Sequence, residues 1–165
     1  MRLLLFIFAL VGVLPVVILI IVFSKLFRLT KINQWIVTSW SQLLCYIMGL
    51  KVEIHGDRPT SPVMVVANHV SWLDICVLMA ACPTRFVAKS EISGWPVLGL
   101  LCRNTGTLFI ERSKRSDTLR INQSIGDVLA TGERVTIFPE GTTSDGSELK
   151  HFHASLLQSA VTMDA

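Results

Sequence analysis

The feature that most constrains this chain is an unbroken apolar run from Leu3 to Phe23, which contains no charged side chain. As a helix rising about 1.5 Å per residue, the run would span roughly 31 Å, close to the hydrocarbon thickness of a bilayer, about 30 Å. Gly12 and Pro15 interrupt the run, but membrane helices tolerate both residues. The run therefore predicts a membrane helix, or a deep hairpin-like anchor, within residues 1–31.

A cleaved signal peptide and a buried helix of a soluble protein are the alternatives to a membrane anchor. The signal peptide is disfavoured because only Met1 and Arg2 precede the run, the run is long, and no small-x-small cleavage site follows it. Three cations follow the run, namely Lys25, Arg28 and Lys31. By the positive-inside tendency they place the rest of the chain on the cytoplasmic face of the cell (inner or plasma) membrane.

Composition agrees with a membrane-associated protein and excludes several other classes. Of the 165 residues 51% are hydrophobic, and the mean hydropathy is +0.55, which is high for a soluble protein. The net charge of +3 comes without a basic module interleaved with aromatic residues, so nucleic acid is not an expected partner and membrane lipid is. The four cysteines have no C-x-x-C spacing, which indicates reduced thiols and no metal site.

Residues 32–50 have the pattern of an amphipathic helix. Apolar residues recur at three- and four-residue steps, namely Ile32, Ile36, Trp40, Leu43, Ile47 and Leu50. Trp35, Trp40 and Tyr46 favour the boundary between water and lipid, so we expect an interfacial helix. A helix that packs into the core of the domain would show the same periodicity.

Residues 51–165 alternate between strand-like and helix-like segments, which predicts an α/β domain with an open mixed sheet flanked by helices. The expected strands are Lys51–His55, Val63–Ala67, Arg85–Ala88, Leu108–Glu111 and Val135–Phe138. The expected helices are Trp72–Ala81, Ile92–Cys102 broken at Pro96, Asp117–Ala130 and Glu148–Val161.

His69 and Asp74 are the first candidates for chemistry. His69 follows an expected strand, and Asp74 falls in the first turn of the next expected helix. A neutral imidazole can accept a proton near pH 7, and a carboxylate can orient it. The alternative is structural, because Ser71-x-x-Asp74 also fits a capping box.

Two later blocks carry further candidates. Gly106-Thr-Leu-Phe-Ile-Glu-Arg112 ends in a guanidinium, whose planar fork of donors suits a phosphate, although Arg112 could also belong to a solvated charge cluster. Phe138-Pro-Glu-Gly-Thr142 follows a strand, and its glycine lets backbone N–H groups approach an anion. Alone, this block would be an ordinary Pro-Glu-Gly turn.

The block Asn68-His-Val-Ser-Trp-Leu-Asp74 and the two later blocks, in this order, resemble the lysophospholipid acyltransferase family, and in particular the 1-acyl-glycerol-3-phosphate acyltransferases. The resemblance implies a glycerolipid acyltransferase-like fold and a catalytic domain over 51–165. The reaction would be acyl transfer to the sn-2 hydroxyl of a lysophospholipid acceptor, 1-acyl-glycerol-3-phosphate, giving phosphatidic acid. The cosubstrate would be acyl-CoA or acyl-ACP, the acyl thioester of acyl carrier protein, with no other cofactor.

The resemblance also implies roles for single residues. His69 would be the general base and Asp74 its orienting acid. The residues matched to substrate binding are Gly106, Arg112, Glu140, Gly141, Thr142 and, at a basic position common in the family, Lys89.

One departure and three alternatives stand beside this prediction. Family members usually continue to a further strand with a Val-Pro block, so we expect this chain to lack the C-terminal part of the domain. The alternatives are the same chemistry on another lysolipid such as lyso-ornithine lipid, a lipid-binding protein without turnover, and a lipid hydrolase that directs the His–Asp pair at water.

Overall fold

The computed structural model describes residues 1–27, 29–59, 62–111 and 114–163. The chain divides into two compact units. One consists of Met1–Gly56 with Trp72–Pro83, and the other of Asp57–Ser71 with Thr84–Ala165. Each unit combines two stretches of sequence because helix α4 (Leu73–Ala81) packs with the N-terminal helices, although it lies between two strands of the sheet in the chain.

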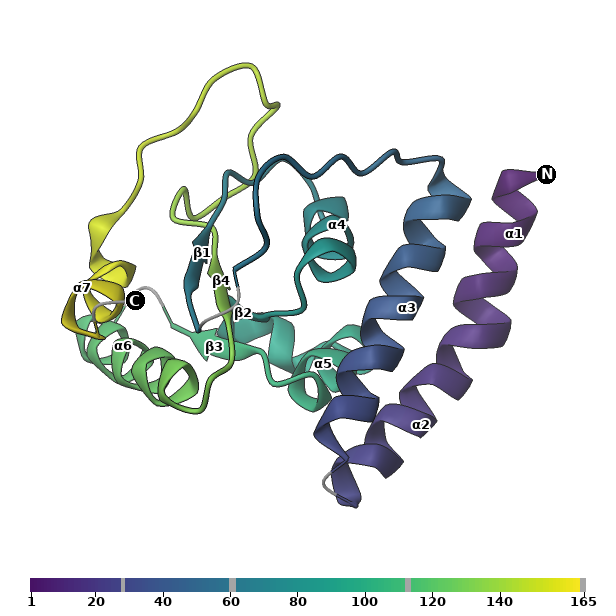
Figure 1. The fold of residues 1–165 in the computed structure, drawn as a ribbon, viewed down its shortest axis with the longest axis horizontal. Coiled ribbons are helices and arrows are strands. Elements are labelled where there is room, and N and C mark those ends of the chain that lie inside the picture. Colours follow the sequence, from purple (N-terminus) through teal and green to yellow (C-terminus); the bar gives the residue numbers. More distant parts are fainter. Residues whose placement is uncertain (28, 60–61, 112–113, 164–165) are drawn as a thin grey trace. The chain divides into compact units, whose positions relative to one another are not determined.

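The apolar run at the N-terminus is helical, as predicted (Figure 1). It consists of α1 (Arg2–Phe8), a π-helical turn (Ala9–Val13) and α2 (Leu14–Leu26). The wide turn ends two residues before Pro15, whose missing N–H removes one hydrogen bond of a regular helix. By length and composition, the helix Arg2–Leu26 could cross a membrane.

Helix α3 (Thr30–Met48) packs against α1, α2 and α4. It buries Trp40, Leu44 and Ile47 in a cluster with Ala9 of the π-helical turn. Trp35 is 70% exposed and Tyr46 80% exposed. The predicted amphipathic helix is therefore present. It buries residues against its own unit, as the core-packing alternative requires, and keeps two of the three aromatic residues expected at a lipid boundary exposed.

The other unit is built on a four-stranded sheet in the order β1-β4-β2-β3 (Figure 1). The strands are β1 (Met64–Val66), β2 (Arg85–Lys89), β3 (Leu108–Ile110) and β4 (Val135–Ile137). The predicted open α/β sheet flanked by helices is confirmed. All pairings among these strands are parallel, so this part of the sheet is not mixed. Parallel pairing follows from the connections, each of which contains a helix that returns the chain to the same edge.

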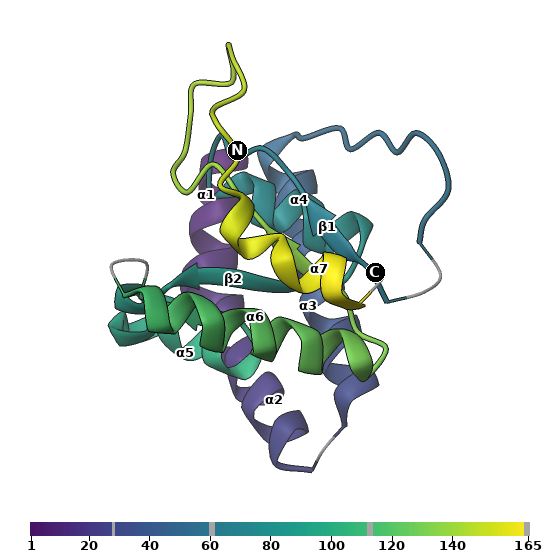
Figure 2. The same cartoon turned by 90° about the vertical axis from the view of Figure 1, so that its left-hand side faces the viewer.

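Helix α6 (Arg115–Ala130) covers part of this sheet. Its residues Ile121, Ile125 and Leu129 recur at four-residue steps and join Val135 and Ile137 of β4 in one buried cluster. The short helix α7 (Gln158–Met163) lies beside α6 (Figure 2). The remaining helical segments of the unit are Ser90–Gly94, α5 (Pro96–Asn104) and Ala154–Leu156.

Two predicted elements are wrong. Lys51–His55 is irregular rather than a strand. Lys51 Nζ contacts Glu53 Oε1 at 2.5 Å, so two of the alternating polar residues pair with each other at the surface. The predicted helix Glu148–Val161 is reduced to a 3-10 turn and α7. Within that segment the backbone N–H of His153 donates to the carbonyl oxygen of Pro139 at 3.0 Å, which is a tertiary bond and not a helical one.

Candidate active site

Most of the predicted site residues follow strands of the parallel sheet. His69 follows β1, Lys89 ends β2, and Glu140 to Thr142 follow β4. Residues that follow parallel strands meet at the carboxyl edge of the sheet, which is the usual binding edge of open α/β folds. The topology therefore brings residues from three separate stretches of sequence to one edge.

The imidazole of His69 packs on the first residue of the third block. The rings of His69 and Phe138 are stacked, with centroids 4.1 Å apart and planes 19° apart. Phe138 also stacks with Phe86 of β2, with ring centroids 6.1 Å apart. The candidate base is thus positioned by a buried aromatic side chain that belongs to another sequence block.

The backbone of His69 is held by the loop that follows the third block. Its carbonyl oxygen accepts the N–H of Ser144 at 2.8 Å and the Ser144 hydroxyl at 3.4 Å. A Cβ added at Gly146 would lie 3.4 Å from the side chain of Val70, so this loop also packs closely on the residue after His69. The segment at His69 and the loop after the third block are therefore held together within the same unit.

Glu140 is the unusual residue of the third block. Its side chain is 4% exposed, and neither carboxylate oxygen has a hydrogen-bond partner among the described residues. A buried carboxylate without a donor is costly, because burial removes its hydration. The chain turns directly after Glu140, at Gly141, whose φ of 76° lies in the left-handed region that favours glycine. The N–H of Gly141 donates to the carbonyl oxygen of Phe138 at 3.1 Å.

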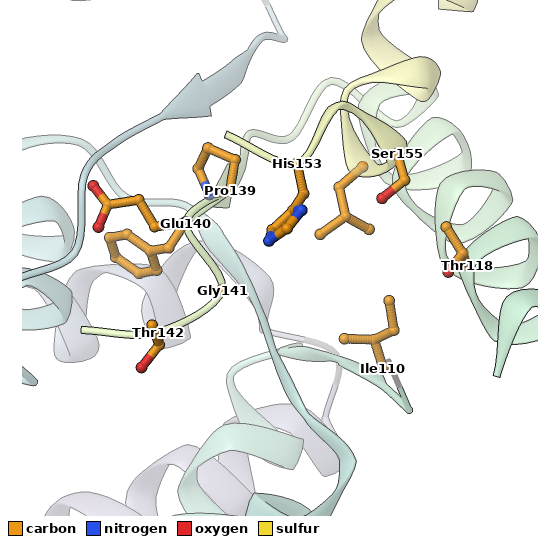
Figure 3. A pocket seen from close by; sticks show the side chains of 10 residues that line it. Ile110, Thr118, Pro139, Glu140, Gly141, Thr142, His153 and Ser155 are labelled. Carbon is orange, nitrogen blue, oxygen red and sulfur yellow. The ribbon is translucent and has the colours of Figure 1, made fainter. Parts of the chain in front are cut away.

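A pocket of about 380 Å³ opens beside this turn (Figure 3). The third block forms one wall. Ile110, the last residue of β3, and the buried Leu156 contribute apolar surface, while Thr118, His153 and Ser155 bring polar side chains from other elements. This combination of apolar surface and a few polar groups is typical of a site for a small molecule or headgroup.

The predicted cations lie toward this edge or outside the described residues. Lys89 is exposed and in register with Ile110 of the neighbouring strand, but it does not line the pocket. Arg112 lies outside the described residues, two positions after the end of β3. Among the described residues no group of three or more His, Cys, Asp or Glu is placed to hold a metal ion.

The residues around Arg112 in sequence form a charged network. The Arg120 side chain and the N–H of Glu111 donate to the Asp117 carboxylate, and these bonds lower its pKa to about 2. Lys114 pairs with Glu111 at 2.7 Å, which raises the pKa of the lysine.

Asp74 lies in the first turn of α4, which belongs to the other unit of the chain. The N-cap of the helix is Trp72, which provides no capping hydrogen bond from its side chain. The capping-box alternative for Ser71 and Asp74 stays a prediction. The pairing of Asp74 with His69 also stays a prediction.

Gly106 is placed apart from the other predicted site residues. It precedes β3, at the amino edge of the sheet, and has a φ of 81°. A Cβ there would lie 3.1–3.2 Å from the guanidinium of Arg85, which forms a two-bond pair with Glu133. The structure thus gives Gly106 a role in a tight turn, and the pocket at the opposite edge does not include it.

Sequence reasoning missed several residues at this edge, namely Thr118, Phe138 as a ring partner, Ser144, His153 and Ser155. Phe138 lay inside a recognised block, so its position carried a signal, but its stacking on His69 did not. His153 has no recognisable spacing from the other blocks, and only the fold brings it to them.

Comparison with known proteins agrees with this geometry. The family model described as Acyltransferase matches residues 50–165. A lyso-ornithine lipid O-acyltransferase from Rhizobium meliloti (strain 1021) is 41% identical over 133 residues, which are 80% of this chain and 46% of that protein. A 1-acyl-sn-glycerol-3-phosphate acyltransferase from Neisseria gonorrhoeae is 45% identical over 118 residues, which are 72% of this chain and 46% of that protein.

A solved structure has the same fold. The crystal structure of the 1-acyl-sn-glycerophosphate (LPA) acyltransferase PlsC from Thermotoga maritima matches with a TM-score of 0.68 at 21% identity, covering 92% of this chain and 69% of that chain. The present chain spans about half the length of the relatives named above.

Proposed function

The chain belongs to the Acyltransferase family, and from this premise we propose that it transfers a fatty acyl group from an acyl thioester to the sn-2 hydroxyl of 1-acyl-sn-glycerol-3-phosphate. The product is phosphatidic acid. The observation that carries the proposal is that the His69 block and the Phe138–Thr142 block are joined at one edge of the sheet, by the stacked rings and by the bonds from Ser144.

His69 acts as the general base in this mechanism. Its neutral imidazole accepts the proton of the acceptor hydroxyl while the oxygen attacks the thioester carbonyl carbon. The tetrahedral oxyanion then collapses, the C–S bond breaks, and the imidazolium returns the proton to the leaving thiolate. Asp74 orients the ring, and general acid–base catalysis of this kind contributes about 10²–10⁴-fold in rate. The donor is acyl-CoA or the acyl thioester of acyl carrier protein (acyl-ACP).

The acceptor headgroup binds at the same edge. Arg112 supplies a fork of donors for phosphate, with Lys89 as a second cation. Glu140 accepts a hydrogen bond from a glycerol hydroxyl, which would give its buried carboxylate the donor that the described residues do not provide. Gly141 and Thr142 complete the contacts from the turn.

We further propose that residues 1–31 anchor the protein in the membrane. Residues 32–50 would lie at its interface, and the catalytic domain would be on the cytoplasmic face. The length and hydropathy of Arg2–Leu26 and the exposed Trp35 and Tyr46 support this arrangement.

Lyso-ornithine lipid is the second candidate acceptor. A relative named for that substrate is as similar to this chain as the relative named for 1-acyl-sn-glycerol-3-phosphate, at 41% against 45% identity. Both acceptors present a hydroxyl to the same base, so the chemistry is unchanged and only the headgroup contacts differ.

An acyl-transfer assay on the purified chain in detergent micelles tests the proposal. Acyl-CoA and acyl-ACP, each with a labelled acyl group, are supplied with 1-acyl-glycerol-3-phosphate, with lyso-ornithine lipid, or with no acceptor. The proposal expects labelled phosphatidic acid. Acylated ornithine lipid alone would favour the second acceptor. Fatty acid released without acceptor would indicate a hydrolase, and acceptor binding without any product would exclude an enzyme made of these residues alone.

A further inference from the structure

The wall of the pocket opposite the Phe138–Thr142 block has no role in the mechanism above. It is formed by Thr118 in the first turns of α6, and by His153 and Ser155 around the Ala154–Leu156 turn. These residues lie in segments that none of the three sequence blocks includes. Figure 3 shows the imidazole of His153 projecting into the middle of the pocket, between Gly141 and Ser155.

His153 is held at this position by backbone bonds. Its N–H donates to the carbonyl oxygen of Pro139 at 3.0 Å, which ties it directly to the third block. The next turn is tied to α6, because the side-chain amide of Asn122 donates to the backbone carbonyl oxygen of Ser155 at 2.7 Å. The segment is therefore fixed on both sides of the pocket while the side chain of His153 stays exposed.

We propose that His153, with the hydroxyls of Thr118 and Ser155, binds the anionic group of the acceptor headgroup and so contributes to acceptor selection. This inference rests on the proposed function. The shared chemistry is an anionic oxygen group, which is the phosphate of 1-acyl-glycerol-3-phosphate or the carboxylate of lyso-ornithine lipid. An imidazole and two hydroxyls offer donors to either group.

Three observations favour a headgroup over an acyl chain in this pocket. Its opposite walls carry polar side chains, which an acyl chain would leave without partners. Phe138 both lines the pocket and stacks on His69, so a headgroup bound here lies one aromatic ring from the base. The carboxylate of Glu140 points away from His153 in Figure 3, so it does not oppose an anion beside the imidazole.

The test compares three variants of the whole chain in detergent micelles: His153→Ala, His153→Gln and His151→Ala. Equilibrium binding and KM are measured for each acceptor and for the acyl donor, together with melting curves. His151 is the matched control, since it neighbours His153, with ring centroids 5.5 Å apart, but does not line the pocket.

We expect His153→Ala to weaken binding of the preferred acceptor about tenfold, which is the effect of losing one hydrogen bond to a charged group. His153→Gln keeps a donor and should show a smaller loss. The donor KM and the melting temperature should be unchanged, and His151→Ala should bind like the unaltered chain. The acceptor that responds, phosphate or carboxylate, identifies the headgroup.

The inference is overturned if both His153 variants bind both acceptors as tightly as the unaltered chain. Should His153→Ala fail to fold, His153→Gln gives the same decision. If the unaltered chain transfers acyl groups and the His153 variants bind both acceptors equally well, only this inference fails. If it neither binds nor acylates either acceptor, the proposed function fails and this inference fails with it.

Discussion

The carboxylate of Asp117 accepts the backbone N–H of Glu111 at 2.5 Å through one oxygen and the Nε–H of Arg120 at 2.6 Å through the other. Arg120 in turn donates to the carbonyl oxygen of Phe109 at 2.7 Å. Together, these two side chains fix the backbone that leads from β3 toward Arg112. Asp117 and Arg120 thus fix the backbone of residues 109–111, which precede the proposed phosphate ligand Arg112 in the sequence, although neither side chain lines the pocket.

This arrangement predicts a pH-dependent stability. The bond from Arg120, followed by the bond from Glu111, lowers the pKa of Asp117 from 3.8 to about 2. A lowered carboxyl pKa stabilises the fold above the unfolded value and loses that effect as the pH falls from about 4 to about 2. Asp117→Asn should therefore lower the urea midpoint at pH 7, and its difference from the unaltered chain should shrink through that window. An equal difference at both ends would contradict the assignment.

Gly106→Ala should affect stability rather than substrate binding. A non-glycine residue in the left-handed region costs about 1–2 kcal/mol, and here the added Cβ also meets the guanidinium of Arg85. Gly132→Ala is the matched control, because its φ is 83° and nothing lies within 4 Å of the added Cβ. Gly106→Ala should be the less stable variant in urea, with an unchanged acceptor KM. A raised KM without loss of stability would restore Gly106 to the acceptor site.

Glu140→Gln should separate stability from activity. Removing a buried charge that has no donor among the described residues is expected to raise the free energy of unfolding, by about 1 kcal/mol or more. The same change should weaken binding of the acceptor lipid, because an amide oxygen accepts a hydrogen bond from the lipid hydroxyl less strongly than a carboxylate does. Urea titrations and acceptor KM values test both parts, and a variant that is less stable would show that the carboxylate has a partner in the folded protein.

Phe138→Leu tests the ring stacking on His69. Leucine retains much of the apolar volume but removes the stacked face 4.1 Å from the imidazole. Such a volume change costs about 1–2 kcal/mol in stability. In addition, kcat should fall in the folded variant, because the base is less well oriented. Phe86→Leu removes the other ring from the same stack and serves as the comparison. Equal losses of kcat in both variants would mean that packing alone matters.

His69→Ala should abolish acyl transfer while the fold and the association with membranes are retained. The loss expected from removing a general base is about 10²–10⁴-fold in kcat. Turnover of labelled acyl thioester, vesicle flotation and a melting curve are the three measurements. Residual transfer near the unaltered rate would assign the base to another residue.

The sheet and its main helix were predictable because their signals are local. Val135–Phe138 is a continuous apolar and β-branched run, and Ile121, Ile125 and Leu129 repeat at four-residue steps. Lys51–His55 alternates without being a strand, because a strand also needs a neighbouring strand to pair with, which alternation does not provide.

The site was predictable to the extent that its residues follow strands. A parallel sheet places the ends of its strands at one edge, so His69 and Glu140 could be expected there together. The ring of Phe138 on His69, the bond from Ser144 and the position of His153 could not, because each depends on packing between segments far apart in the chain. The Asp74 and Arg112 roles rest on the family resemblance.

The sheet order has a consequence for synthesis on the ribosome. In the described sheet β1 pairs with β4, the last of the four strands to emerge, and the loop after β4 holds the backbone of His69. Strand β1 therefore stays without its native neighbour while the chain between β1 and β4 is translated. The candidate base therefore acquires its ordered position only after β4 and the following loop have left the ribosome, when β4 can join β1 to β2.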